Sequence, residues 1–246
     1  MKKVFALVLA ALMALCCVAC GEPKEDINAK SEGVMTYAEF DAAALESKVV
    51  IEAYVQGKQA YSAQYGNTSI YAQDGDGAYF IYRMPCSQEE YDKIAIGSKI
   101  KVTGYKAEWS GEVEIIDATF EIVEGNYVAD KFDVTALLAS ADLIKHQNKA
   151  IAIKGATVAA SKDAAGNEVA FLYNWDGSGQ DGNDLYFNIT VNGATYNLCV
   201  ESDLCGADTA VYAAVKALKI GDTIDLEGFL YWYNGANPHI TSVTTK

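Results

Sequence analysis

Two stretches of this chain repeat each other at a constant separation, and this repeat constrains the fold more than any other feature. Residues 96–111 read IGSKIKVTGYKAEWSG, and residues 220–235 read IGDTIDLEGFLYWYNG, which is an offset of 124 positions. Residues 48–57 and 149–158 also parallel each other. A repeat of this kind predicts two copies of one structural unit. The chain length of 246 residues is sufficient for two ordinary domains.

The first copy predicts a regular order of strands and helices. Capping boxes at Thr36–Glu39 and Ser87–Glu90 predict two short helices. An Asp-Gly-Asp-Gly segment at 74–77 predicts a hairpin turn. Five strands are expected from β-rich or alternating segments, at residues 48–57, 67–73, 78–84, 99–107 and 112–123.

The second copy repeats this order with a longer connection at 176–184. Residues 132–143 predict a leading helix, and residues 168–175 predict a strand that precedes the connection. Residues 185–201 predict a further hairpin around Asn192-Gly193, followed by a helix and two closing strands. Gly104 and Gly228, which align in the repeat, lie inside strands, where a glycine marks a bend or bulge of a small barrel.

The order of three strands, a helix and two strands, together with the shared I-G-x-x-I-x-[VL]-x-G pattern, resembles the OB-fold. The resemblance covers residues 34–246 and implies a mainly β chain of two tandem five-stranded Greek-key barrels. Each barrel would carry a short helix between its third and fourth strands and a short leading helix. We expect the first domain at 34–125 and the second at 126–246. OB-folds bind oligonucleotides or oligosaccharides on the face of strands two and three.

The N-terminus has the layout of a secretory signal. Two lysines precede an apolar run at 4–15, and the segment ends in Cys17-Val18-Ala19-Cys20. Small residues before a cysteine resemble the lipobox of bacterial lipoproteins. The resemblance implies a signal peptide at 1–19, a diacylglycerol on Cys20, export, and attachment to the outer face of a membrane. An uncleaved membrane anchor is the alternative. Residues 20–33 are expected to form a lipidated, flexible spacer.

The charge of the chain is strongly acidic. Nineteen basic and 33 acidic residues give a net charge of −14, and no segment forms a basic patch. We therefore do not expect nucleic acid as a partner. The plain explanation of the acidity is that it keeps an exported protein soluble.

No catalytic, cofactor-binding or metal-binding motif stands out. His146 and His239 lie in no catalytic signature, so we expect neither an enzyme nor a cofactor. Cys199 and Cys205 form a disulfide or remain buried thiols. Asp176, Asp181 and Asp184 offer calcium ligands in a glycine-rich loop, but Phe187 stands where an EF-hand requires a glutamate.

Aromatic residues are the strongest indication of a ligand site. The chain has 16 tyrosines, and many rings fall on the strands that bind ligands in OB-folds or near the last hairpin. About half of the rings on an alternating strand face the core instead. The candidate ligand-binding residues are Tyr71, Tyr82, Trp109, Tyr173, Trp175, Trp232 and Tyr233.

These observations favour a non-enzymatic, surface-tethered binding or scaffold lipoprotein. Its expected ligand is an extracellular glycan, a peptide or a partner protein. Two alternatives remain open: a single-stranded nucleic-acid binder, which the OB-fold resemblance implies, and an accessory subunit of an extracellular enzyme.

Overall fold

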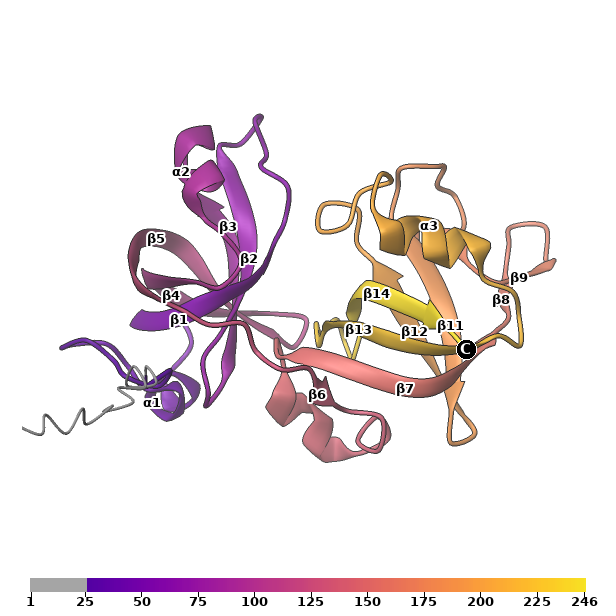
Figure 1. The fold of residues 1–246 in the computed structure, drawn as a ribbon, viewed down its shortest axis with the longest axis horizontal. Coiled ribbons are helices and arrows are strands. Elements are labelled where there is room, and N and C mark those ends of the chain that lie inside the picture. The colour runs from indigo at the N-terminus through magenta and orange to yellow at the C-terminus, as the bar shows by residue number, and fades with distance from the viewer. Residues whose placement is uncertain (1–25) are drawn as a thin grey trace, which may run out of the picture.

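The structure, a computed structural model, describes residues 26–246, so the predicted signal peptide and Cys20 lie outside the described residues. Two β-barrels lie side by side (Figure 1). The first is closed, in the strand order β1-β2-β3-β5-β4. Its elements are α1 (Tyr37–Ala42), β1 (Lys48–Lys58), β2 (Asn67–Gln73), β3 (Ala78–Pro85), α2 (Gln88–Lys93), β4 (Ser98–Trp109) and β5 (Glu112–Asn126).

The second barrel has the same connections. Its strands follow the order β7-β11-β12-β14-β13, and a pairing between β11 and β7 closes the ring. The prediction of two OB-fold-like barrels is therefore confirmed. The elements are β7 (Ala150–Ala159), β11 (Leu185–Val191), β12 (Ala194–Val200), α3 (Ala210–Ala217), β13 (Thr223–Phe229) and β14 (His239–Thr245).

Local sequence signals account for the helix starts and the first hairpin. The Thr36 hydroxyl accepts a hydrogen bond from the backbone N–H of Glu39, whose carboxylate accepts one from the N–H of Thr36. Ser87 and Glu90 repeat this arrangement at α2. In the turn between β2 and β3, the Asp74 carboxylate accepts backbone hydrogen bonds at 2.8 and 2.7 Å. The two capping boxes and the Asp74 turn each provide hydrogen-bond acceptors for backbone N–H groups that would otherwise lack a partner.

The aligned glycines mark matching bulges. The register between β4 and β5 shifts at Gly104, and the register between β13 and β14 shifts at Gly228. A Cβ atom at Gly104 would lie 2.6 Å from Ile115 Cγ2, and one at Gly228 would meet the backbone carbonyl of His239. Only glycine allows the strands to approach this closely, and the bend helps each barrel to close.

The start of the second domain differs from our prediction. Residues 132–143 do not form an α-helix: they contain the short strand β6 (Phe132–Asp133), and the 3-10 helix η1 (Ala141–His146) begins near their end. Phe132 pairs in parallel with Ile151 of β7. Tertiary pairing therefore overrides the local helical pattern.

The long insertion of the second barrel also differs. Residues 168–175 carry only β9 (Glu168–Val169) and β10 (Leu172–Tyr173), and β9 pairs with β8 (Ser161–Lys162) outside the barrel. The second strand of the ring is instead β11. None of the helices within 26–246 is long and apolar enough to cross a membrane.

The described part of the expected spacer contacts the first barrel. The ammonium of Lys30 binds the Asp74 carboxylate at 2.6 Å and the backbone carbonyl of Glu52 at 2.6 Å. Asn28 hydrogen-bonds to the same turn, through Asp76 and Gly75. Both side chains of the Lys30–Asp74 pair are buried. Residues 26–33 thus belong to the first domain rather than to a free spacer.

Each barrel has its own apolar core, and a third apolar cluster joins the two. The ring of Tyr71 on β2 stacks on Phe229 of β13, with centroids 4.3 Å apart and planes 4° apart. The Tyr71 hydroxyl hydrogen-bonds to Nδ1 of His239 at 2.9 Å. The Glu112 carboxylate accepts a hydrogen bond from the backbone N–H of Trp232 at 2.8 Å. These contacts hold the barrels in a defined relative position.

Candidate ligand-binding cleft

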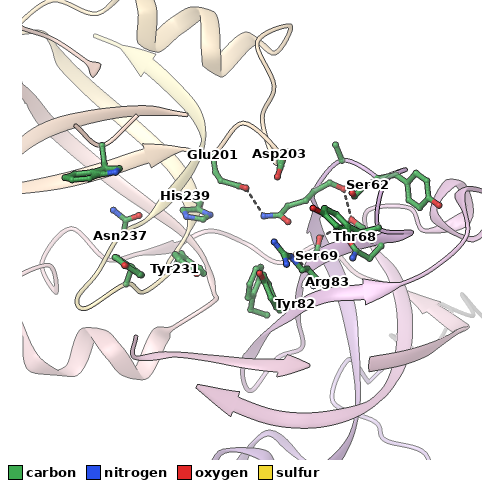
Figure 2. Close-up of a pocket in the computed structure, with 18 of the residues that line it drawn as sticks. Ser62, Thr68, Ser69, Tyr82, Arg83, Glu201, Asp203, Tyr231, Asn237 and His239 are labelled. Atoms are coloured by element: carbon green, nitrogen blue, oxygen red, sulfur yellow. Dashed lines mark hydrogen bonds between the residues drawn. The ribbon is translucent and has the colours of Figure 1, made fainter. Parts of the chain in front are cut away.

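A cleft of about 950 Å³ lies where the two barrels face each other. Figure 2 shows Tyr82 and Arg83 on the side of the first barrel, with Glu201, Tyr231 and His239 on the side of the second. A volume in this range suits a small or medium-sized organic ligand. Both barrels contribute walls, so the cleft exists only in the paired arrangement.

A β-bulge shapes the wall of the first barrel. Thr68 pairs with Met84 and Ile70 pairs with Ile81, so Tyr82 and Arg83 together face the single residue Ser69. Arg83 has a φ of 44°, in the left-handed region, and its backbone N–H donates to the Ser69 hydroxyl at 3.2 Å. Such a conformation costs a non-glycine residue about 1–3 kcal/mol. Bulges redirect side chains next to functional sites, and here both bulged residues line the cleft.

The wall of the second barrel contains a neutral histidine. His239 is buried, and Tyr231 stacks on its ring with centroids 4.3 Å apart. Burial lowers the pKa of His239 to about 3, so its imidazole is uncharged at neutral pH. His239 therefore positions Tyr71 and Tyr231 by packing and hydrogen bonding rather than by charge.

An acidic group lies beside this wall. The Glu201 carboxyl accepts a hydrogen bond from Nε2 of Gln59, across the interface, at 2.9 Å. Burial raises the pKa of Glu201 to about 8, and the nearby Asp203 and Asp184 add to the rise. A protonated Glu201 offers both a donor and an acceptor to a ligand. The second connection across this part of the cleft is the backbone hydrogen bond from Ala60 to the Asp203 carbonyl, at 2.6 Å.

Exposed rings surround the opening. Trp175 is 76% exposed, Tyr65 is 64% exposed and Tyr233 is 55% exposed, and all three line the cleft. Side-chain amides accompany them, from Asn67, Asn197 and Asn237. Flat rings beside amide groups can contact the faces of a ligand while hydrogen-bonding its edges.

The structure brings together three of the seven predicted ligand-binding residues. Tyr82, Trp175 and Tyr233 line the cleft. Tyr71 is fully buried in the interface, where no ligand reaches it. Trp109 is exposed at the β4–β5 hairpin but does not line the cleft.

The remaining two predicted rings serve packing. Tyr173 packs against the core of the second barrel and against Phe171. Trp232 also packs on that core, and its indole lies against Gly111 of the first barrel. Alternation along a strand separates inward from outward side chains, but it does not reveal which outward ring meets another domain.

Sequence reasoning missed several lining residues, including Tyr61, Tyr65 and Arg83. The two tyrosines lie in the loop between β1 and β2, and OB-folds use loops of this kind for ligands. That signal was available in the sequence. The bulge that places Arg83 has no such signal, because it depends on strand pairing.

The predicted calcium ligands do not converge. Asp181 binds Lys216 at 2.6 Å, Asp184 accepts hydrogen bonds from Ser202, and Asp176 accepts one from the backbone of its own loop. Within residues 26–246 no group of three or more His, Cys, Asp or Glu side chains could hold a metal ion.

The disulfide alternative does not hold. Cys199 and Cys205 are free and buried, as is Cys86. Burial raises the pKa of Cys205 to about 11 and also raises the pKa of Cys199. Burial and the raised pKa values therefore disfavour the thiolate form of Cys199 and Cys205 at neutral pH.

Comparison with known proteins gives only distant similarity. No protein-family model matches the chain, and no curated protein is similar to it in sequence. A murine DNA-binding protein bound to double-stranded DNA has a TM-score of 0.35 at 12% identity, covering 80% of this chain and 94% of its own. The tetrameric p202 HIN2 has a TM-score of 0.31 at 12% identity, covering 81% and 91%. A replication protein A heterotrimer bound to single-stranded DNA has a TM-score of 0.30 at 11% identity, covering 82% and 51%.

Two of these similar structures are DNA complexes, whereas we expected no nucleic-acid partner for this chain. That expectation rested on the net charge of the whole chain. A phosphate contact depends on the local charge, and a cation, Arg83, lies in the cleft of this acidic protein. Total charge therefore does not exclude nucleic acid.

Proposed function

We propose that this chain is a non-enzymatic OB-fold binding protein that holds a short extracellular oligosaccharide in the cleft between its barrels. The main observation in support of this proposal is that exposed aromatic rings and side-chain amides from both barrels line one cleft. Sugar rings have an apolar face that suits aromatic side chains, and their hydroxyls suit amides and carboxyls. Tyr82 and Tyr233 contribute rings from opposite walls.

The repeat supplies a matched pair of variants for testing this site. Trp109 and Tyr233 occupy equivalent positions, both are exposed, and only Tyr233 lines the cleft. We expect the wild-type chain to bind members of a glycan array. Tyr82→Ala and Tyr233→Ala should each weaken binding by more than about 1 kcal/mol, and Trp109→Ala should leave it unchanged. Equal binding by all three variants would place the ligand elsewhere.

A single-stranded oligonucleotide is the second candidate ligand. The observation that favours it is the position of Arg83, whose guanidinium carbon lies 5.0 Å from the ring centroid of Tyr82 and 5.8 Å from that of Tyr65. Aromatic stacking combined with a cation is how many proteins bind single strands. Titration with short single-stranded DNA, at several salt concentrations, separates this candidate from the glycan.

Export and lipid attachment complete the proposal. They rest on the sequence of residues 1–20 alone, which lies outside the described residues. We expect the expressed chain to incorporate radiolabelled palmitate and to fractionate with membranes, and we expect Cys20→Ala to abolish the labelling. Labelling that persists in this variant would contradict the lipidation of Cys20.

A further inference from the structure

Arg83 is the only arginine in the chain. The other 18 of the 19 basic residues are lysines. A guanidinium presents a planar fork of N–H donors that matches two oxygens of a carboxylate or phosphate, whereas a lysine ammonium is a point charge. The chain thus uses the planar cation at one position only, and that position lines the cleft.

The backbone at Arg83 is unfavourable for an arginine. Its φ of 44° lies in a region that glycine and asparagine adopt far more readily. Of the seven other non-glycine residues with a positive φ in the described chain, six are Asn, Asp or Ser, and Glu46 is the other long side chain. Arg83 therefore carries a backbone cost that the shorter polar residues would lower.

The guanidinium has no anionic partner within residues 26–246. The ion pairs of this part of the chain all use lysine. The guanidinium carbon lies 5.8 Å from the ring centroid of Tyr65 and 5.0 Å from that of Tyr82. Glu201, which also lines the cleft, is already bound to Gln59. Aromatic rings beside an arginine hold its plane while its N–H groups stay available to a ligand.

We infer that Arg83 binds an oxyanion, a carboxylate or a phosphate, on the ligand of the cleft. This inference rests on the proposed function and narrows it to acidic ligands. Glu201 and Asp203 line the same cleft, and their oxygens favour hydroxyl or N–H donors next to them. With one cation on its wall, the cleft suits a ligand with a single acidic group near Arg83 and neutral, hydroxyl-rich units beyond it. A glycan containing a uronic acid has this character.

Paired ligands and paired variants test the inference. The ligands are acidic and neutral forms of the same glycans on an array, and a short single-stranded oligonucleotide. Arg83→Asn removes the charge and tolerates the positive φ, and Arg83→Lys keeps the charge without the planar fork. Lys162→Asn removes one charge from an exposed residue of β8, which lies at the far end of the second barrel (Figure 1). Thermal unfolding confirms that each variant is folded.

We expect the wild-type chain to prefer the acidic form of a glycan. Arg83→Asn should weaken that binding at least about tenfold, Arg83→Lys should weaken it less, and Lys162→Asn should not change it. If the oligonucleotide binds instead, a tenfold loss together with a salt slope that falls by about 1 identifies a phosphate as the oxyanion.

Two outcomes would overturn the inference, and they are distinguishable. If acidic and neutral glycans bind equally and Arg83→Asn binds as the wild type does, the role of Arg83 is wrong while the proposed function stands. If neither the glycans nor the oligonucleotide binds, the proposed function fails, and the inference fails with it.

The single arginine also permits a direct chemical test. Phenylglyoxal modifies guanidinium groups, so the intact mass should show one arginine adduct, which Arg83→Lys should lack. A bound acidic ligand should slow the modification severalfold, and a neutral ligand of equal occupancy should slow it less. A modification rate that no bound ligand changes would place the oxyanion away from Arg83.

Discussion

The two barrels share a topology, yet they differ in what their equivalent residues do. Tyr105 of the first barrel and Phe229 of the second are equivalent in the repeat. Tyr105 is 44% exposed, whereas Phe229 is buried against Tyr71 of the other barrel. The outer face of β13 has therefore become an interface, while the same face of β4 remains a surface. Duplicated strands keep their fold because their inner faces are retained, and they diverge on their outer faces.

The turns and termini diverge in the same way. The first barrel is clamped by the buried Lys30–Asp74 pair at its β2–β3 turn. At the matching turn of the second barrel, Asn192 and Gly193 are exposed. The second barrel instead has a long insertion, which brings Trp175 to the cleft. The first barrel thus has a buried ion pair at this turn, and the second barrel has an exposed turn and an insertion that lines the cleft.

The largest expected effect separates Phe229 from Tyr105. Phe229→Ala should destabilise the protein by about 3–5 kcal/mol, because it removes a buried ring that both barrels contact. Tyr105→Ala should change stability by no more than about 0.5 kcal/mol. Urea unfolding followed by fluorescence measures both variants. A similar loss of stability in Phe229→Ala and Tyr105→Ala would show that the position in the repeat, and not the interface between the barrels, determines the loss.

The aligned glycines should respond unequally to a methyl group. Gly228→Ala places its Cβ against the backbone carbonyl of His239, and we expect a loss of about 2–3 kcal/mol. Gly104→Ala meets the Ile115 side chain at 2.6 Å and the Ile116 backbone carbonyl at 2.7 Å, a less close approach than at Gly228, so we expect about 1–2 kcal/mol. Gly206→Ala, whose nearest neighbour is the end of the Asp208 side chain, is the control. Equal stability of all three variants would contradict the requirement for glycine at the two bulges.

The clamp of the first barrel gives a third comparison. Lys30→Ala should cost about 2 kcal/mol, since it leaves the buried Asp74 without its cation. The loss is moderated because Asp74 still accepts hydrogen bonds from two backbone N–H groups and from Tyr79. Lys154→Ala breaks only the exposed pair with Asp133, so its effect should stay within about 0.5 kcal/mol. Thermal unfolding at low and high salt distinguishes the two variants.

The smallest effect between neighbouring measurements, about 1 kcal/mol for each pH unit, concerns the Glu112 carboxyl. Glu112 hydrogen-bonds to the second barrel and is equivalent to Ala236 in the repeat. Burial raises the pKa of Glu112 to about 8, so the folded state holds this proton more tightly than the unfolded state does. Stability should therefore fall as pH rises from about 4.5 to 8. His239, with its lowered pKa, acts in the opposite sense but only below about 6.5.

Between pH 6.5 and 8 the fall in stability should thus come from buried carboxyls. Glu112→Gln should reduce the slope there by about 1 kcal/mol per pH unit. The amide can also donate to Oδ1 of Asn148, which lacks a partner next to the unpartnered Oε1 of Glu112. Glu168→Gln, on an exposed residue, is the control. An unchanged slope in Glu112→Gln would assign the pH dependence to Glu114 or Glu201.

The sequence predicted what depends on neighbouring residues. The capping boxes of Thr36 and Ser87, the Asp74 turn and the glycine bulges are all short-range devices, and each lies where it was expected. Residues 132–143 were predicted wrongly because the pairing of β6 with β7 decides their conformation. Of the candidate site, the rings at Tyr82, Trp175 and Tyr233 could be found, because exposed aromatics on strands and loops of an OB-fold suggest binding.

The rest of the cleft could not be predicted from the sequence. Tyr71 and Tyr82 lie on neighbouring strands and have similar local patterns, yet one is buried and the other lines the cleft. The difference arises where the second barrel covers the first. The position of Arg83 depends on a bulge in the β2–β3 pairing, which no local pattern indicates.

The stacked pair of Tyr71 and Phe229 also affects how the protein is made. During synthesis the first barrel is complete once β5 has emerged, but Phe229 follows only near the end of the chain. Domains fold as units during synthesis, with the N-terminal unit first. Until Phe229 has been synthesised, Tyr71 and Phe80 are exposed to solvent on the first barrel and form an apolar aromatic surface. A nascent or truncated chain is thus prone to associate with its neighbours, and the second barrel acts as the built-in cover that prevents this.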